Sequence, residues 1–168
     1  MDKYDFLLAS ENDIPEIIGI YHSLIGTPGC TWNEYYPTEE IARSDIESGS
    51  LYILKEGAAI VAVAAAGPFD ELGSLRWSPQ NPCELARIGV VPALHRQGIG
   101  TMLLRKVMEA VKKRGFDGII MLVSKSSPAA LALYDRNGFE RCGDAFMFGF
   151  DFYCYQMQFA PAAKGQSR

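Results

Sequence analysis

Two stretches of this 168-residue chain carry residues that could bind and activate a small molecule. The first is the glycine-bearing turn His95-Arg96-Gln97-Gly98-Ile99-Gly100, which follows an apolar run and leads into apolar residues at helical spacing. Glycines let the backbone approach a ligand closely, and the N–H groups at the start of a helix attract negative charge. A strand, such a turn and a helix in this order predict an anion site, although the same turn could be only a tight connection.

The second stretch could supply a proton donor. It reads Ser127-Pro-Ala-Ala-Leu-Ala-Leu-Tyr134-Asp-Arg-Asn-Gly138-Phe139, so that Tyr134 falls on a helix expected to begin at Ser127 and to end at Gly138. A phenol can protonate a leaving group such as a thiolate. The alternative is that Tyr134 is a core aromatic residue whose hydroxyl bonds locally.

Glu84 is the candidate general base, because an amine must lose a proton before it can act as a nucleophile. It opens the strand that leads into the turn. On a strand with a period of two, Glu84, Ala86, Ile88 and Val90 would share one face. A carboxylate at the start of an otherwise apolar face is either functional or an exposed strand end.

Together the two stretches resemble the Gcn5-related N-acetyltransferase (GNAT) superfamily. Its signature is Gln/Arg-x-x-Gly-x-Gly/Ala followed by Asn-x-x-Ala-x-x-Leu-Tyr-x-x-x-Gly-Phe, and the match is dense from Glu84 to Phe139. His95 stands where the family usually has Gln or Arg, and Ser127 stands where it commonly has Asn. The resemblance implies a single-domain α/β (α+β) fold, with a mixed sheet of about seven strands flanked by about four helices. It also implies acetyl-CoA as the acyl donor.

The resemblance further implies roles for individual residues. The turn would hold the coenzyme A pyrophosphate, and the strand before it would splay and bond the pantetheine arm. The backbone amide of Val90 would polarise the thioester carbonyl, Glu84 or a water chain would act as base, and Tyr134 would act as acid. The implied cofactor-binding residues are Ile88, Gly89, Val90, Arg96, Gln97, Gly98, Ile99, Gly100, Thr101, Ser127 and Tyr134. Ser127 could equally be a plain helix N-cap.

The acceptor side is marked only by aromatic residues in loops and in the last strand. They are Trp32, Tyr35, Tyr36, Trp77 and Tyr153. If they line a cleft, packing and cation–π contacts would favour an amine or an acceptor with an apolar body; otherwise they belong to the core. The branch that acetylates ribosomal-protein N-termini carries a glutamate where this chain has Leu122, which argues against that activity.

The predicted function is transfer of the acetyl group of acetyl-CoA to a primary amine of a small molecule or peptide, directly within a ternary complex. The alternative is a non-catalytic acyl-CoA-binding sensor or regulatory module with a closed acceptor side. A nucleotide-phosphate module of another kind is disfavoured, because the chain lacks the P-loop lysine and the acidic ribose residue. Many relatives pair as homodimers through their last strands, and Phe150–Phe159 is aromatic enough to permit such pairing.

Composition excludes several other classes. A net charge of −4 argues against nucleic-acid and anionic-membrane partners. The absence of Cys-x-x-Cys spacing and the presence of only two histidines argue against a metal site and indicate reduced thiols in a cytoplasmic protein. The first residues do not form a signal-peptide pattern, and the longest apolar run, Ala58–Ala66, is too short to span a bilayer.

The expected order of elements is β-α-α-β-β-β-α-β-α-β-β. Strands are expected over Asp5–Ala9, Leu51–Leu54, Ala59–Ala66, Glu84–Val91, Ile119–Val123, Phe139–Met147 and Phe150–Phe159. Helices are expected from a Ser10–Asp13 capping box to Gly26, from Thr38 to Gly49, over Ile99–Arg114, and from Ser127 to Gly138. Residues 1–160 would form one domain and residues 161–168 a flexible C-terminal tail.

Overall fold

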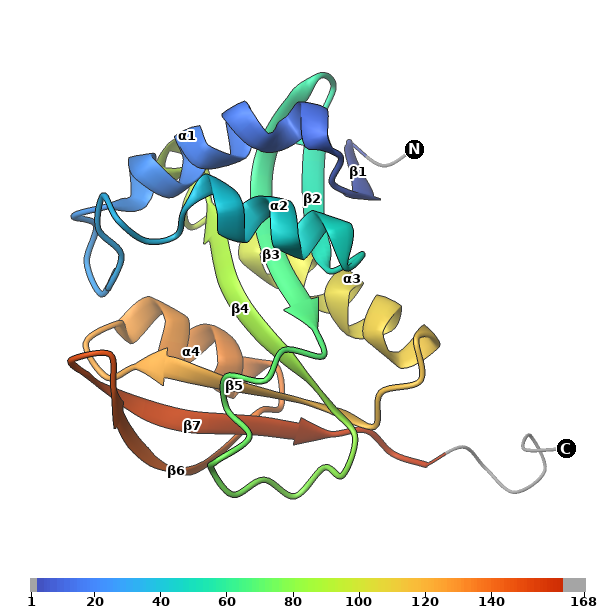
Figure 1. Ribbon diagram of the computed structural model, residues 1–168, viewed down its shortest axis with the longest axis vertical. Helices are drawn as coiled ribbons and strands as arrows, with labels where there is room; N and C mark the ends of the chain where they lie inside the picture. The colour runs from blue at the N-terminus through green and yellow to red at the C-terminus, as the bar shows by residue number, and fades with distance from the viewer. Residues whose placement is uncertain (1–2, 162–168) are drawn as a thin grey trace, which may run out of the picture.

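One mixed sheet with the strand order β1-β2-β3-β4-β5-β7-β6 organises the molecule (Figure 1). The structure is a computed structural model that describes residues 3–161. The strands in this range are β1 (Tyr4–Leu8), β2 (Leu51–Glu56), β3 (Ala59–Gly67), β4 (Pro82–Val90), β5 (Gly118–Ser124), β6 (Glu140–Met147) and β7 (Phe150–Gln158). The helices are α1 (Ile14–Leu24), α2 (Glu39–Glu47), α3 (Ile99–Lys113) and α4 (Pro128–Arg136), with short 3-10 turns η1 (Glu11–Asp13) and η2 (Pro92–Leu94).

The strand pairing is antiparallel throughout except between β4 and β5, which run parallel. The predicted fold, a mixed sheet of seven strands flanked by four helices, is confirmed for residues 3–161. The predicted tail lies outside the described residues, apart from its first residue, Pro161.

Local sequence signals set several element ends. The N–H of Ser10 donates to Asp13 Oδ2 at 2.8 Å, which forms part of the predicted capping box. Thr38 Oγ1 accepts a hydrogen bond from the N–H of Ile41 at 3.2 Å, so Thr38 caps α2 as predicted. The chain turns between β2 and β3 at Gly57, whose φ of +61° is a left-handed conformation that favours glycine. These local features explain why the element ends could be predicted from the sequence to within a few residues.

Helices cover both faces of the sheet (Figure 1). On one face, Tyr21 of α1 packs in a buried cluster with Val63 of β3. On the other face, Leu103 of α3 and Tyr134 of α4 pack in a second cluster with the next residue of β3, Ala64. Successive residues of a strand point to opposite faces, so the two clusters form two separate cores. We call them the α1 cluster and the α3 cluster.

β6 forms one edge of the sheet, and exposed aromatic side chains gather where it turns into β7. Phe146 and Phe148 are 70% and 69% exposed, and Phe150 on β7 is also exposed. β7, which contains most of the segment Phe150–Phe159 expected to permit homodimer pairing, lies between β5 and β6 in the sheet. The pairing itself stays a prediction. In the part of the chain that the structure describes, no helix has the length and apolar character needed to cross a membrane.

The packing of α3 predicts the cost of a cavity. Leu103 is fully buried in the α3 cluster, so Leu103→Ala should lower the free energy of unfolding by about 2–5 kcal/mol. Glu109 lies on the exposed side of the same helix, and Glu109→Ala should change it by less than about 0.5 kcal/mol. Urea unfolding of both variants measures the difference. Equal effects would contradict the assignment of the buried face of α3.

Candidate functional site

β4 and β5 lie side by side at one end and separate at the other. Their pairing covers only Pro82–Glu84 of β4 against Gly118–Ile120 of β5. Beyond these residues, Leu85–Val90 stays with β3 and Met121–Ser124 stays with β7. We call the opening between these last two segments the wedge, and Figure 1 shows the two strands diverging around it. Its facing backbone edges are not paired with each other, and such edges can bond an extended ligand as an added strand.

β4 contains a β-bulge next to the wedge. Ala86 pairs with Ala65 of β3, and Gly89 pairs with Val63. Two residues of β4 therefore lie opposite a single residue of β3, and the first of the two, Arg87, has a φ of +49°. An extra residue of this kind bends the strand and leaves its own backbone groups outside the regular ladder.

Because of this bulge, the side chains of β4 do not face the directions that the sequence pattern predicted. The period-two pattern placed Ile88 and Val90 on the same face as Glu84, but both pack against the α3 cluster, as do Cys83 and Leu85. Glu84 lies between Cys83 and Leu85 on the strand and so points to the opposite face. The prediction was wrong because one inserted residue reverses the facing of every later residue.

The turn between β4 and α3 has the geometry of an anion site. Gly98 occupies the N-cap of α3 with a φ of +80°, which glycine adopts without strain. It has no side chain that could cap the helix, and the first turn of α3 contains no acidic residue. The N–H groups of Ile99, Gly100 and Thr101 consequently have no acceptor within the helix. An anion placed here would receive hydrogen bonds from them and be favoured by the helix dipole.

The two sequence stretches meet beside this turn. A Cβ atom added to Gly100 would lie 3.7 Å from the Leu133 side chain of α4 and 4.0 Å from that of Val90 of β4. Arg105 of α3 donates from Nε to Asn137 Oδ1, at the end of α4, over 3.5 Å. The start of α3, the end of β4 and the body of α4 therefore converge at the open end of the wedge.

His95 contacts the end of β4 rather than pointing away from it. Its Nε2 lies 2.7 Å from the carbonyl oxygen of Val90. The N–H of Val91 donates to Val61 of β3, and neighbouring residues in a strand direct their backbone groups to opposite edges. The backbone groups of Val90 thus face the wedge. His95 bonds the carbonyl and leaves the N–H of Val90 available to a ligand.

Tyr134 is buried behind the wedge. Its ring makes edge contacts with Phe139 and Tyr155, at centroid distances of 5.5 and 6.1 Å. Burial raises the pKa of Tyr134, so the hydroxyl stays protonated at neutral pH. Within residues 3–161 the Tyr134 hydroxyl makes no hydrogen bond. A second tyrosine hydroxyl, Tyr21 Oη, is completely buried and also lacks a partner in this range. Tyr134 is therefore both a core aromatic residue and a protonated phenol without a protein partner.

Glu84 lies where the wedge begins, at the last paired position of β4 and β5. It is only 5% exposed, so the alternative of an exposed strand end is wrong. Its Oε2 accepts a hydrogen bond from the N–H of Leu72 over 3.4 Å. Burial raises the pKa of Glu84 to about 7, although backbone hydrogen bonds from Leu72 and Glu71 oppose the rise. A carboxylate with a pKa near neutrality is suited to accept a proton at physiological pH.

Ser127 occupies the N-cap position of α4, but its hydroxyl makes no capping hydrogen bond. The plain N-cap interpretation is therefore wrong for the side chain, while the backbone oxygen still accepts from the N–H of Leu131 at 3.0 Å. Gly29, in the α1–α2 connection, packs so closely that an added Cβ atom would collide with Ser127. This connection thus reaches across to the start of α4.

Two of the predicted acceptor aromatics lie next to β4. Trp32 is 3.6 Å from the position of a Cβ atom added to Gly89, and its ring makes an edge contact with Tyr21. The hydroxyl of Tyr36 accepts a hydrogen bond from Arg87 Nη1 at 3.1 Å. Both residues come from the α1–α2 connection, which therefore approaches the wedge from the face that carries α1 and α2.

The other three predicted acceptor aromatics are more dispersed. Trp77 Nε1 donates to the carbonyl oxygen of Leu72 at 2.9 Å, so it supports the segment that contacts the candidate base. Tyr35 is 77% exposed. Tyr153, on β7, packs with the α3 cluster, and the guanidinium carbon of Arg141 lies 4.0 Å from its ring centroid. The structure thus does not gather all five aromatics into one cleft.

Comparison with known proteins assigns the family. A model described as "Acetyltransferase (GNAT) family" matches residues 17–139, which is more than half of the chain. The chain belongs to the GNAT acetyltransferase family. The N-acetyltransferase 8F1 of Rattus norvegicus is 28% identical over 126 residues, which cover 71% of this chain and 55% of the rat protein. The chain spans about half the length of the first curated relatives that it matches.

Solved GNAT structures share the fold. The ribosomal-protein-S18-alanine N-acetyltransferase from Escherichia coli matches with a TM-score of 0.74 at 20% identity, over 96% of this chain and 97% of that one. YncA from Salmonella typhimurium, solved with its cofactor acetyl-CoA, matches with a TM-score of 0.77 at 17% identity, over 99% of this chain and 100% of that one. At these identities the likeness establishes the fold of the GNAT domain.

Two residues near the site, Arg87 and Asp45, were not predicted from the sequence. Arg87 of β4 forms two hydrogen bonds with Asp45 of α2, from Nε to Oδ2 at 2.9 Å and from Nη2 to Oδ1 at 3.0 Å. The available signal was a charged residue in the middle of a strand whose one other charged residue is Glu84. Its partner could not be found, because nothing local in the sequence links the two positions.

The raised pKa of Glu84 predicts how stability depends on pH. A raised pKa in the folded state gives a stabilising contribution that is complete below the ordinary value of 4.5 and is lost as the pH rises through about 7. Glu84→Gln removes this titration. The stability of the variant relative to the wild type should therefore increase from pH 4.5 to pH 7.5, by on the order of 2–3 kcal/mol in urea unfolding. A difference between Glu84→Gln and the wild type that does not vary with pH would contradict the burial argument.

Proposed function

We propose that this GNAT domain transfers the acetyl group of acetyl-CoA directly to a primary amine of a small molecule or peptide within a ternary complex. The observation that carries the proposal is the buried carboxylate of Glu84 at the closed end of the wedge, with an anion-binding turn at the other end of the same strand. Membership of the family supports an acyl-CoA donor, as does the acetyl-CoA bound to YncA.

In this proposal the donor lies along β4. The turn formed by Arg96–Thr101 holds the pyrophosphate through backbone N–H groups, because its helix start lacks both a capping side chain and an acidic residue. The pantetheine arm then follows Ile88–Val90 into the wedge. Gly89 supports this path, because its missing Cβ atom leaves room for Leu24 behind the strand.

The length of β4 decides where the acyl group can react. A strand rises about 3.3 Å per residue, so Val90 lies roughly 20 Å along the strand from Glu84, beyond the reach of a glutamate side chain. We therefore assign the N–H of Val90 to the pantetheine arm rather than to the thioester carbonyl. The acyl carbon would lie deeper in the wedge, beside the bulge, where a backbone N–H outside the ladder can polarise the carbonyl.

The chemistry then needs two proton transfers. The attacking amine gives its proton to Glu84, directly or through water, and its nitrogen bonds to the thioester carbon. The carbon–sulfur bond breaks, and the departing thiolate takes the proton of Tyr134, which burial keeps protonated until then. The tyrosinate then recovers a proton through solvent while Glu84 gives its proton up, so the net products are the amide and the thiol. The carboxylates of Asp70 and Glu71 lie near Glu84, so their field favours an acceptor that arrives as an ammonium cation. Such an acceptor loses one proton to solvent before it attacks as the neutral amine.

Acetyl-CoA binding tests the donor site. At a concentration of about 100 times Kd, acetyl-CoA should stabilise the wild type by about 2.7 kcal/mol in thermal unfolding. Thr101→Glu places a carboxylate in the first turn of α3, where it favours the helix but repels a pyrophosphate, so Kd should rise by about tenfold or more, which corresponds to ~1.4 kcal/mol. Thr101→Gln is the uncharged control and should bind nearly as the wild type does. Equal weakening by both variants would contradict the electrostatic role of the turn.

Turnover tests the proposed acid. Thiol release from acetyl-CoA is measured across a panel of amines, peptides and aminoglycosides. Tyr134→Phe should lower kcat by about 10²-fold without changing the Kd of acetyl-CoA, because a proton donor acts only in the chemical step. Tyr4→Phe, on the edge strand β1, is the matched control and should retain full activity. Binding of acetyl-CoA without thiol release from any acceptor would favour a non-catalytic acyl-CoA-binding module instead.

A further inference from the structure

The backbone of Arg87 is held in an unfavourable conformation. A φ of +49° brings the Cβ atom of an L-residue close to its own backbone, and only glycine adopts it readily. The regular alternation of β4 would also turn Arg87 toward α3, together with Cys83 and Leu85. The bulge instead turns Arg87 toward α2, so side-chain contacts on that face must hold the residue there.

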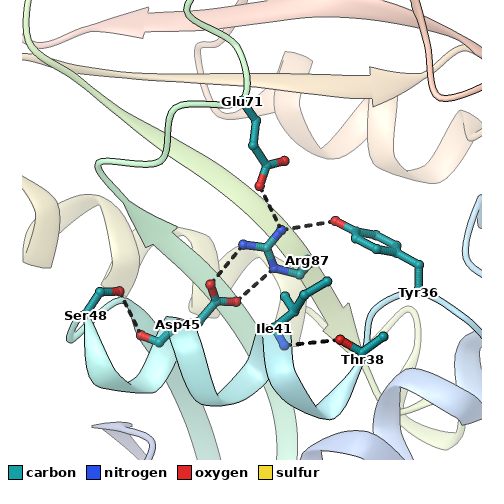
Figure 2. Close-up of polar contacts among 7 residues, drawn as sticks. All are labelled: Tyr36, Thr38, Ile41, Asp45, Ser48, Glu71 and Arg87. Carbon is teal, nitrogen blue, oxygen red and sulfur yellow. Dashed lines mark hydrogen bonds and ion pairs between the residues drawn. The ribbon is translucent and has the colours of Figure 1, made fainter.

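Asp45 supplies the main contact, as Figure 2 shows. The guanidinium and carboxylate side chains are only 3% and 5% exposed and are joined by the two hydrogen bonds described above. Burial raises the pKa of Asp45, and the guanidinium of Arg87 opposes that rise. Removing one partner of a buried ion pair leaves the other charge unpaired, which is strongly unfavourable. The pair therefore fixes the bulge of β4 against α2.

The remaining nitrogen of Arg87 holds two other segments. Nη1 donates to the hydroxyl of Tyr36 at 3.1 Å, and it lies 3.5 Å from Glu71 Oε1. Figure 2 shows both side chains converging on this nitrogen. The ring of Phe69 lies 5.0 Å from the guanidinium carbon. Tyr36 comes from the α1–α2 connection, whereas Phe69 and Glu71 come from the β3–β4 connection, so one side chain joins both.

The β3–β4 connection contacts β4 at two places. Glu71 contacts Arg87, and the next residue, Leu72, donates its N–H to Glu84. A hollow of about 310 Å³ lies between this connection and α2, with Arg87 and Asp45 in its wall. The segment is thus not packed solidly against the helix. The guanidinium is the contact that ties it to β4 at Arg87, and the hydrogen bond from Leu72 ties it to Glu84.

We propose that Arg87 is a positioning residue that couples the α1–α2 and β3–β4 connections to the strand carrying the acyl donor, and thereby aligns Glu84 with the wedge. The inference rests on the proposed acyl transfer. According to this inference, loss of Tyr36 or Glu71 changes acceptor binding and the rate of the chemical step. The affinity for the donor does not change, because the anion-binding turn lies at the other end of β4.

The first test removes single contacts and leaves the buried ion pair intact. Tyr36→Phe and Glu71→Gln should each raise the KM of the acceptor by about tenfold, or lower kcat by a similar factor, with the Kd of acetyl-CoA unchanged. Arg43→Gln is the matched control. Arg43 lies on the same helix α2 but pairs with Glu11 and Glu39 on the surface, so its loss should change none of these quantities. Normal acceptor kinetics in both Tyr36→Phe and Glu71→Gln would overturn the proposal.

The second test separates positioning from stability. Arg87→Gln leaves Asp45 unpaired and should lower the thermal midpoint, whereas adding Asp45→Asn should restore much of it. Under the proposal kcat stays about 10²-fold low in the double variant, as expected when a reacting group is displaced. The pH profile of kcat/KM, which reports Glu84, should be shifted as well. Recovery of both stability and kcat in the double variant would show a merely structural role.

Amide hydrogen exchange gives a readout that does not depend on activity. Loss of Arg87 should raise the exchange rate of the Leu72 N–H by about tenfold or more, because the segment bonded to Glu84 is freed. Arg43→Gln should leave that rate unchanged. Unchanged exchange in the double variant would overturn the coupling, even if the wild type transfers acetyl groups. If loss of Arg87 speeds the exchange but the wild type transfers to no acceptor, the coupling is supported and only the proposed function is rejected.

Discussion

The short parallel pairing between β4 and β5 is the constraint on which the site depends. Three residues on each strand hold the two strands together at one end, and the strands diverge beyond them. Pairing along their whole lengths would leave no free backbone edges for a ligand and would bring the turn before α3 against β5. Because the pairing stops at Glu84, the same position ends the ladder and places a carboxylate at the closed end of the wedge.

The environment of that carboxylate comes from elements far apart in the chain. β4 brings Glu84 into the interior, and the β3–β4 connection covers it and supplies the N–H of Leu72. Its removal from water disfavours the charged form, and the neutral backbone donors of Leu72 and Glu71 compensate this only in part. A fully satisfied carboxylate would be a stronger acid and a poorer base, so incomplete satisfaction is what suits Glu84 to proton transfer near neutral pH.

The sequence predicted those features whose causes are local. The glycine turn and the start of α2 at Thr38 depend on neighbouring residues, and both lie where expected. The facing of β4 was mispredicted, because the bulge depends on Arg87 meeting Asp45, and strand alternation gives no sign of that meeting. The type and position of Ser127 allowed a capping residue or a cofactor contact; its hydroxyl makes no capping hydrogen bond, and Gly29 packs closely against it. The separation of β4 from its neighbour was predicted from the resemblance to a family, because hydrophobic periodicity carries no information about strand pairing.

The wedge has a topological consequence. An opening between two neighbouring strands connects the two faces of a sheet, and here it does so between the α1 cluster and the α3 cluster. The glycine turn before α3 lies at one end of this passage, whereas Tyr36 and Glu71 reach it from the face that carries α2 (Figure 2). The segments on the two faces can therefore diverge separately during evolution. Insertions in the connections on the α1 face would change the side chains beside Arg87, while the helix start on the opposite face keeps the same uncapped backbone N–H groups.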